Sequence, residues 1–172
     1  ASAFCAIANG GTAVKPRLIE RIGDDIQPVA KGKQILKPTT CETVLNYMRS
    51  VMTSEHGTGK SLKIPGYDLG GKTGTAQKTN RNTKSMKGGG YVANFVGFVP
   101  ASNPRAVILV MVDDPQGGKY YGGEVAGPVF LELAQQCASD AFGARARAVE
   151  RFAIREPLVL EAEGREVQVH LG

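Results

Sequence analysis

Two strongly β-prone runs in the middle of the chain set the tightest limit on its fold. Residues Tyr91–Val99 and 106–112 are rich in Val, Phe, Ile and Tyr, the residue types that strands favour. Only residues 100–105, with a proline at each of two positions, separate them. A parallel pair would need a crossover of about a dozen residues or more, so we expect antiparallel neighbours in one sheet.

Helical patterns flank these strands on both sides. Thr39 is expected to be the N-cap of a first helix, with Glu42 as its capping-box partner, and apolar residues recur at helical spacing until Gly57. A second helix is expected over residues 125–142, with Pro128 in its first turn. The order of helix, strands and helix indicates an α+β fold in which helices cover an antiparallel sheet.

The two ends of the chain give weaker patterns. Residues 1–9 predict a helix that stops at two glycines, and residues 14–22 and 29–36 predict short strands on either side of a turn at Asp24 and Asp25. The first helix lacks an N-cap, which suggests a fragment of a longer protein. We expect one domain over residues 1–143 and a small extension, a hairpin or tail, over residues 144–172.

Composition narrows the class of protein. No run of about 18 uncharged apolar residues occurs, and the N-terminus has no secretory pattern, so any membrane anchor or export signal is expected outside this sequence. The three cysteines are far apart in predicted helices, which favours small buried apolar residues over a disulfide framework or a zinc site. No metal or cofactor is expected.

Charge is unevenly distributed along the chain. The net charge is +5, and no Asp or Glu occurs between Leu69 and Val112. This pattern predicts either a positive field that attracts an anion or a solvated basic loop. The basic residues of the segment are Lys72, Lys78, Arg81, Lys84, Lys87 and Arg105.

The run from Gly66 to Thr73 satisfies the phosphate-binding pattern G-x-x-x-x-G-K-[ST]. Asp113 and Asp114, after a β-prone run, even resemble a magnesium-binding strand end. A phosphate-binding loop must, however, follow a buried parallel strand and open directly onto a helix, and neither flank here has such a pattern. Nucleotide binding is therefore only a remote alternative.

Lys72, Thr73 and Gly74 also match the K-T-G element of serine acyl-transferases. An exposed edge strand that lines a cleft needs a lysine for positive potential and hydroxyls for a substrate carboxylate. It also needs a glycine so that nothing blocks approach to the strand. Gly74 would serve equally well as a β-bulge.

Residues 70–77, with the sequence GGKTGTAQ, resemble the extended signature of class B penicillin-binding proteins. The resemblance runs from residue 1 to about residue 142 and is greatest to the septal-division and sporulation branch. Other segments with family-like sequence, in the right order, are 8–11 with Pro16, 57–60, 64–67, 92–100, 103–105, 120–123 and 127–130.

The resemblance implies a penicillin-binding, β-lactamase-like fold and a serine D,D-transpeptidase. In that family a serine attacks a D-alanine carbonyl of a peptidoglycan stem peptide, and the acyl group then passes to an amine on a neighbouring strand. It implies that Lys72 assists proton transfer and anion binding. The hydroxyls of Thr73 and Thr75 would hold the substrate carboxylate, Gly74 would keep the strand open, and the backbone N–H of Thr75 would form half of the oxyanion hole.

The same resemblance implies partners and a location. The expected ligands are the stem peptide and β-lactam antibiotics, which acylate the same serine, and cell-division proteins are expected partners. No nucleic-acid partner is expected. The location implied is the bacterial cell envelope, on the extracytoplasmic side of the cytoplasmic membrane.

Two motifs that the family requires, S-x-x-K and S-x-N, are missing from this sequence. In the family both precede K-T-G, so we expect the nucleophile in a missing N-terminal part of the protein, possibly on a separate chain. The competing class is a non-catalytic module that binds an anion or glycan without turnover. The intact mass of the native protein distinguishes the two classes.

We predict that the 172-residue polypeptide alone is not acylated by a fluorescent penicillin, because it has no serine in a family motif. Gel fluorescence and intact-mass measurement check this. Stoichiometric covalent labelling of the isolated chain would contradict the prediction.

Overall fold

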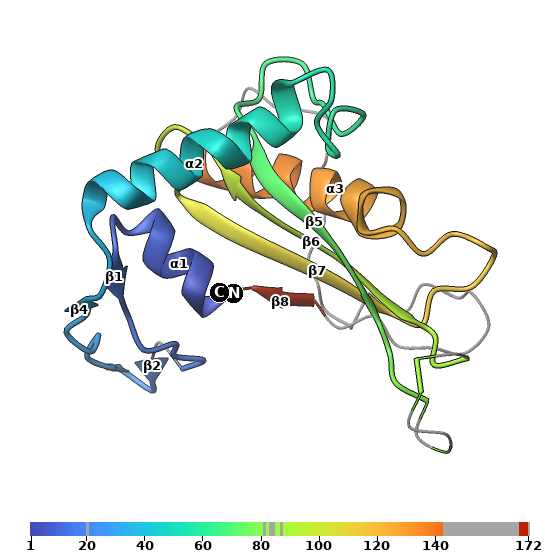
Figure 1. Ribbon diagram of the computed structural model, residues 1–172. Coiled ribbons are helices and arrows are strands. Elements are labelled where there is room, and N and C mark those ends of the chain that lie inside the picture. The colour runs from blue at the N-terminus through green and yellow to red at the C-terminus, as the bar shows by residue number, and fades with distance from the viewer. Residues whose placement is uncertain (20, 81, 83–84, 87, 143–168, 172) are drawn as a thin grey trace.

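The computed structural model describes residues 1–172 except 20, 81, 83–84, 87, 143–168 and 172. Its centre is a four-stranded sheet in the order β5-β6-β7-β8, and every neighbouring pair is antiparallel (Figure 1). The expected antiparallel pair is confirmed, and so is the α+β class. The strands are β5 (Gly70–Gln77), β6 (Tyr91–Val99), β7 (Ala106–Asp113) and β8 (Val169–Leu171).

Helices cover both faces of this sheet (Figure 1). Helix α1 (Ser2–Ala8) and most of α2 (Pro38–Thr53) pack on the face to which Val96 and Phe98 of β6 point. Helix α3 (Gly122–Phe142) packs on the opposite face, where Phe95 contacts Phe130 with a centroid distance of 4.6 Å. Alternation along β6 therefore supplies two hydrophobic cores from one strand.

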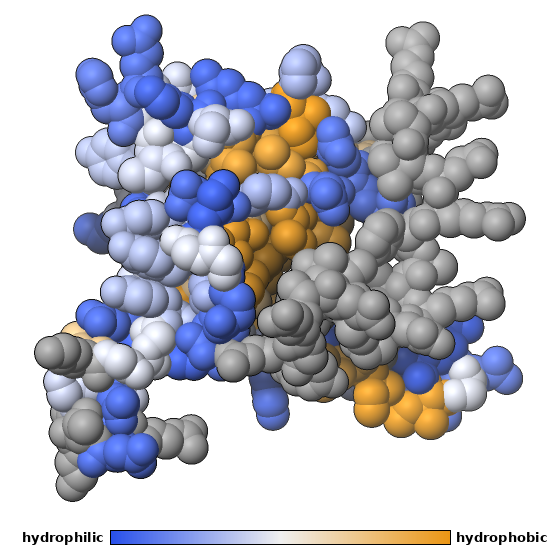
Figure 2. Space-filling model, turned by 90° about the vertical axis from the view of Figure 1, so that its right-hand side faces the viewer, coloured by the Kyte–Doolittle hydropathy of each residue, from blue (hydrophilic) through white to orange (hydrophobic). Residues whose placement is uncertain are grey.

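Strand β6 is the most deeply buried part of the sheet, because it has a strand on each side and helices on each face. Phe95 and Phe98 have no solvent exposure. Burial on both faces explains why its sequence is a continuous apolar run without polar alternation. Seen from the side where the chain leads into α3, apolar side chains gather in the middle of the face, next to hydrophilic ones (Figure 2).

The capping box predicted for α2 is wrong. The helix begins at Pro38, its N-cap is Lys37 without a side-chain hydrogen bond, and Thr39 already lies in the first turn, so Glu42 has no cap to pair with. Proline at the start has φ preset for a helix and no N–H that needs a partner. The Cys41 N–H donates to the Lys37 carbonyl at 3.2 Å and closes the first turn.

The predicted start of α3 is also wrong, by three residues. The helix begins at Gly122, so Pro128 lies inside it instead of in its first turn. The N–H groups of Glu124 and Val125 both donate to the Tyr121 carbonyl at 3.0 Å. A hydrogen bond from the Gly122 N–H to the Thr75 hydroxyl of β5 stabilises this earlier start. Local sequence patterns do not predict a contact between residues so far apart in the chain.

The strands predicted for residues 14–22 and 29–36 are much shorter than expected. Strand β1 (Thr12–Ala13) pairs with β4 (Lys33–Gln34), and β2 (Arg21–Ile22) pairs with β3 (Asp25–Ile26). The turn between β2 and β3 lies at Gly23 and Asp24, one residue earlier than predicted. Pro16 and Pro28 lack the N–H that a ladder needs, which limits the pairing.

The remaining expectations concern the cysteines and the chain end. Cys5, Cys41 and Cys137 lie in α1, α2 and α3, and only Cys41 is fully buried. None of the described helices has the length and hydropathy needed to cross a membrane. The extension predicted for residues 144–172 lies almost entirely outside the described residues, apart from β8.

Phe95→Ala should lower the free energy of unfolding by about 3–5 kcal/mol, because it empties the space against Phe130 in a fully buried site. Met111→Ala is the control: its side chain is 48% exposed on β7, and a change within about 0.5 kcal/mol is expected. Denaturant unfolding measures both. Equal losses in the two variants would contradict this account of the core.

Candidate active site

The candidate site residues lie in β5, the edge strand of the sheet. Its pairing with β6 is continuous, from Gly70 opposite Phe98 to Gln77 opposite Tyr91. The ladder contains no extra residue at Gly74, so the alternative of a β-bulge is wrong. An edge strand keeps one row of backbone donors and acceptors unpaired, which is the property that a peptide-binding strand requires.

The phosphate-loop alternative is also wrong. Lys72 and Thr73 lie within an extended antiparallel strand, and α3, the next helix along the chain, begins only at Gly122. Asp113 ends β7, also antiparallel, and Asp114 is a turn residue with φ of 55°. Neither the loop that would surround a phosphate nor the helix N-terminus behind it is formed.

Gly74 leaves room for a side chain of the neighbouring strand. A methyl group at Gly74 would overlap the amide of Asn94, the residue opposite it in β6. The glycine thus lets Asn94 lie flat against β5. Sequence analysis did not identify Asn94 as a neighbour, because only the register of the two strands reveals it.

The candidate residues are divided between the two faces of β5. Thr73 and Thr75 point toward the α3 side, where they line a cavity of about 670 Å³ together with the start of α3. Lys72 points toward the opposite face, as strand alternation requires, and does not line that cavity. The structure therefore brings the two threonines together in one cavity, whereas the lysine leaves the strand on the other face and only its ammonium group reaches back to Thr73.

The Lys72 side chain is exposed, and among the described residues it forms no ion pair. Its Nζ donates to the Thr73 carbonyl at 2.8 Å, with a longer contact of 3.4 Å to the Thr73 hydroxyl. The ammonium group thus remains a positive charge on the edge strand with donors to spare.

Each threonine hydroxyl has a partner from a different part of the chain. The Thr73 hydroxyl donates to that of Thr58 at 3.1 Å. The Thr75 hydroxyl accepts a hydrogen bond of 3.1 Å from the backbone N–H of Gly122, the first residue of α3. This second bond fixes the positive end of the α3 dipole beside the threonines.

Gly122 is a glycine for a steric reason. A Cβ there would overlap the carbonyl oxygens of Asn94 and Gly74, so no side chain fits. The close approach brings the first N–H of α3 within reach of Thr75. Helix start, edge strand and central strand are therefore in direct contact at one point.

Three tyrosines are in ring contact with one another, and one of them, Tyr121, lines the cavity. Tyr91 stacks on Tyr120 with a centroid distance of 4.2 Å, and Tyr121, which lines the cavity, is 56% exposed. The hydroxyl of Tyr120 donates to that of Tyr121 at 3.4 Å, and this hydrogen bond raises the pKa of Tyr120 above its ordinary value. Tyr120 therefore stays protonated at neutral pH.

One of the basic residues behind the predicted positive field is paired with a carboxylate. Lys78 forms an ion pair with Asp113 at 2.8 Å, so part of the charge is balanced from β7. Arg81, Lys84 and Lys87 lie outside the described residues. A larger depression of about 820 Å³ lies between α2 and residues 62–69, and it contains none of the candidate residues.

Comparison with known proteins gives the family. The model of the penicillin-binding protein transpeptidase domain matches residues 1–135. The chain belongs to this family.

Relatives in the transpeptidase family agree in sequence and in structure. The chain is 42% identical over 135 residues to the probable peptidoglycan D,D-transpeptidase PenA of Neisseria gonorrhoeae, covering 77% of this chain and 22% of PenA. It is 35% identical over 136 residues to stage V sporulation protein D of Bacillus subtilis, covering 74% of this chain and 20% of that protein.

Among solved structures, penicillin-binding protein 3 of Mycobacterium tuberculosis matches with a TM-score of 0.71 and 31% identity. The match covers 81% of this chain and 34% of that one. The chain thus spans about a fifth of the length of these two curated relatives. The penicillin-binding fold class, inferred from resemblance, is confirmed.

Sequence analysis missed three contributors to the site. Thr58 and Gly122 lie in segments that were noted only as family-like, and Asn94 was not singled out within its strand. Thr58 is 15 residues from Thr73, and Gly122 is 47 residues from Thr75. Contacts at such separations follow from the tertiary fold, and short-range spacing cannot reveal them.

Thr75→Val should lower the free energy of unfolding by about 1 kcal/mol, since it removes the acceptor of the part-buried hydrogen bond from the Gly122 N–H. Thr75→Ser keeps the hydroxyl and should retain most of the stability. Denaturant unfolding and amide exchange at Gly122 measure the effect. Unchanged Gly122 exchange in the valine variant would show that the bond does not anchor α3.

Proposed function

We propose that this chain is part of a serine D,D-transpeptidase that cross-links peptidoglycan stem peptides. The main support is the edge strand with Lys72 on one face and the Thr73 and Thr75 hydroxyls on the other, beside the start of a helix. The names of relatives such as PenA point to the same reaction. The chain would supply one wall of the site and not its nucleophile.

The substrate carboxylate would be held by Thr73 and Thr75, and the Thr73 hydroxyl would turn its proton from Thr58 to the carboxylate. A hydroxyl has one proton to donate and two lone pairs to accept with. Because the Thr75 oxygen accepts from Gly122, its proton remains available for a carboxylate in the cavity. The nearby N-terminus of α3 adds a favourable potential for an anion.

The reaction itself would take place at the strand edge. A serine oxygen attacks the D-alanine carbonyl, and the terminal D-alanine leaves as an amine that takes up a proton. A second amine then attacks the acyl-enzyme and frees the serine. The backbone N–H of Thr75 would be one oxyanion donor, a type of contact whose loss costs about 3 kcal/mol in other acyl-transfer enzymes.

Lys72 would assist proton transfer from the face of β5 that lies opposite the threonines. An exposed ammonium without a carboxylate partner among the described residues is suited to this role. The serine motifs that complete the site would come from outside this chain.

The same chemistry extends to antibiotics, partners and location. β-Lactams would acylate the same serine, and penicillin-binding protein 3 of M. tuberculosis has been solved with aztreonam and with ampicillin. The reaction would take place in the bacterial envelope, on the extracytoplasmic side of the cytoplasmic membrane. Cell-division proteins would be its partners, as the resemblance to the septal-division and sporulation branch implies; one relative is named stage V sporulation protein D.

In the complete gene product, Lys72→Ala should lower the acylation rate by a fluorescent penicillin by about 10²–10⁴-fold, the usual contribution of a group that transfers a proton. Lys33→Ala, an exposed lysine of β4, is the matched control and should react at the unchanged rate. A time course of fluorescent-penicillin labelling measures the acylation rates of both variants. If the unchanged complete protein takes up no penicillin, the non-catalytic binding module replaces the enzyme.

A further inference from the structure

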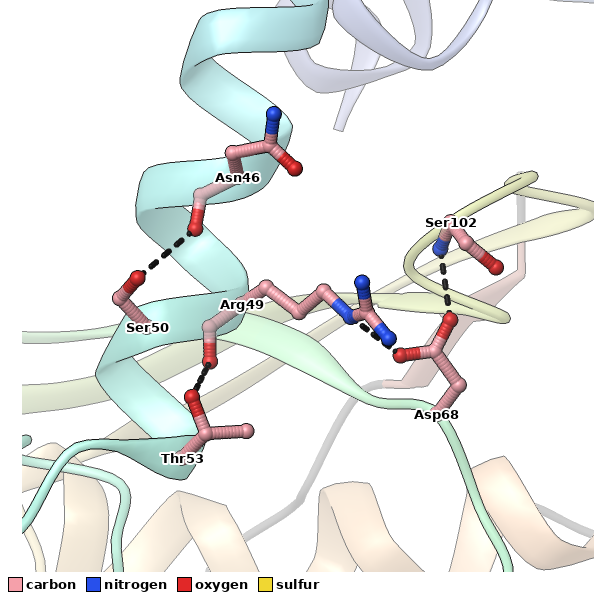
Figure 3. A network of polar contacts seen from close by, with 6 residues as sticks. All are labelled: Asn46, Arg49, Ser50, Thr53, Asp68 and Ser102. Carbon is pink, nitrogen blue, oxygen red and sulfur yellow. Dashed lines mark hydrogen bonds and ion pairs between the residues drawn. The ribbon is translucent and has the colours of Figure 1, made fainter.

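A polar network lies at the beginning of β5, away from the threonine cavity (Figure 3). Asp68, two residues before the strand, accepts from Arg49 Nε of α2 at 2.6 Å and from the Ser102 N–H at 2.8 Å, one contact for each carboxylate oxygen. Its backbone carbonyl accepts from the Ala101 N–H at 2.9 Å. One residue therefore joins α2, the turn after β6 and the start of β5.

Beneath this network, α2 and the start of β5 are closely packed. A Cβ at Gly70, the first residue of β5, would lie 3.0 Å from the Ala101 Cβ and 3.3 Å from the Arg49 backbone nitrogen. The glycine lets the backbone of α2 lie directly on the strand. Gly70 thus allows the close approach of helix and strand, and the Arg49–Asp68 pair links α2 to the residues just before the strand.

Strand β5 needs such a constraint because it is an edge strand. Among the described strands only β6 pairs with it, and its other edge is the one that a peptide ligand would occupy. The Thr75 hydroxyl holds one end of the K-T-G segment to α3, and Asp68 holds the other end, four residues before Lys72.

We propose that Asp68, with Arg49 as its partner, is a positioning residue of the transpeptidase site that fixes where Lys72 and Thr75 stand relative to α2. This inference rests on the proposed function. Asp68 touches no reacting group. It acts through the strand that carries them.

Because the Arg49–Asp68 ion pair is partly exposed, its loss should affect the geometry of the site more than the free energy of folding. The Arg49 side chain is 47% exposed and that of Asp68 is 26% exposed, beside the open depression of about 820 Å³. An ion pair this exposed adds little to the free energy of folding. Catalysis is more sensitive, because a displacement of about 1 Å can cost about 10²-fold in rate.

The ionisation of Asp68 supports the same role. Burial alone would raise its pKa, but hydrogen bonds from Ser102 and the hydrogen bond and charge of Arg49 together lower it below the ordinary value. The charged form is therefore the one that the fold stabilises. Its contribution is complete above the ordinary carboxyl pKa and is lost as the pH falls through the lowered pKa.

The test measures β-lactam acylation rates in the complete gene product. Asp68→Ala and Arg49→Ala should each slow acylation about tenfold or more. The double variant should be no slower than the worse single variant, because both changes release the same contact. Asp113→Asn is the matched control: it removes the carboxylate charge from the Lys78–Asp113 pair at 2.8 Å, the other ion pair among the described residues, and should leave the rate unchanged.

A conservative variant adds a readout that a structural role would not change. Asp68→Asn keeps an acceptor for Ser102 but loses the charge, so its rate should fall between those of the unchanged protein and Asp68→Ala. The advantage of the unchanged protein over Asp68→Asn should disappear as the pH falls through the lowered pKa. A constant ratio at all pH values would count against the inference.

The outcomes distinguish this inference from the proposed function. If the unchanged protein is acylated and Asp68→Ala reacts equally fast, Asp68 does not position the site and the function stands. If the unchanged protein is not acylated, the function fails and the positioning role for that reaction fails with it. Hydrogen exchange over Gly70–Gln77 should be faster in Asp68→Ala than in Asp113→Asn, and equal exchange would overturn the inference without reference to activity.

Discussion

The ladder between β5 and β6 is the interaction on which the rest of the site depends. Strand β6 is fixed by burial on both faces and by a strand on each side, and β5 takes its position from that one neighbour. The sheet can therefore combine a rigid centre with an edge that stays open. Lys72, Thr73 and Thr75 stand on this edge, where backbone groups remain free for a ligand.

Glycines allow this arrangement to be compact. A side chain at Gly71 would overlap the ring of Phe95, and one at Gly97 would overlap the ring of Phe130. The two rings contact each other and fill the space between sheet and α3. The glycines around the K-T-G segment thus serve packing, whereas Gly74 and Gly122 serve the close approach of Asn94 and of a helix end.

The sequence predicted the features that depend on local composition. Apolar runs located β6 and β7, their short connection gave the antiparallel pairing, and the flanks of Lys72 separated a K-T-G strand from a phosphate loop. Sequence-based prediction failed where the structure depends on residues that are far apart in the chain. The start of α3 depends on Thr75, 47 residues away, and the role of Asp68 depends on Arg49 and on the turn at Ser102. The capping box failed because Pro38 starts α2 without it.

The hydrogen bond from Gly122 to Thr75 has an electrical consequence for the cavity. Donation from the end of α3 polarises the threonine hydroxyl, and hydrogen bonds in such a chain strengthen one another. The partial positive charge at the start of this helix of 21 residues thereby makes the hydroxyl proton of Thr75, on the neighbouring strand, more positive. The helix thus strengthens the Thr75 hydroxyl as a hydrogen-bond donor to an anion in the cavity, although it would act through a backbone N–H and not through its side chains.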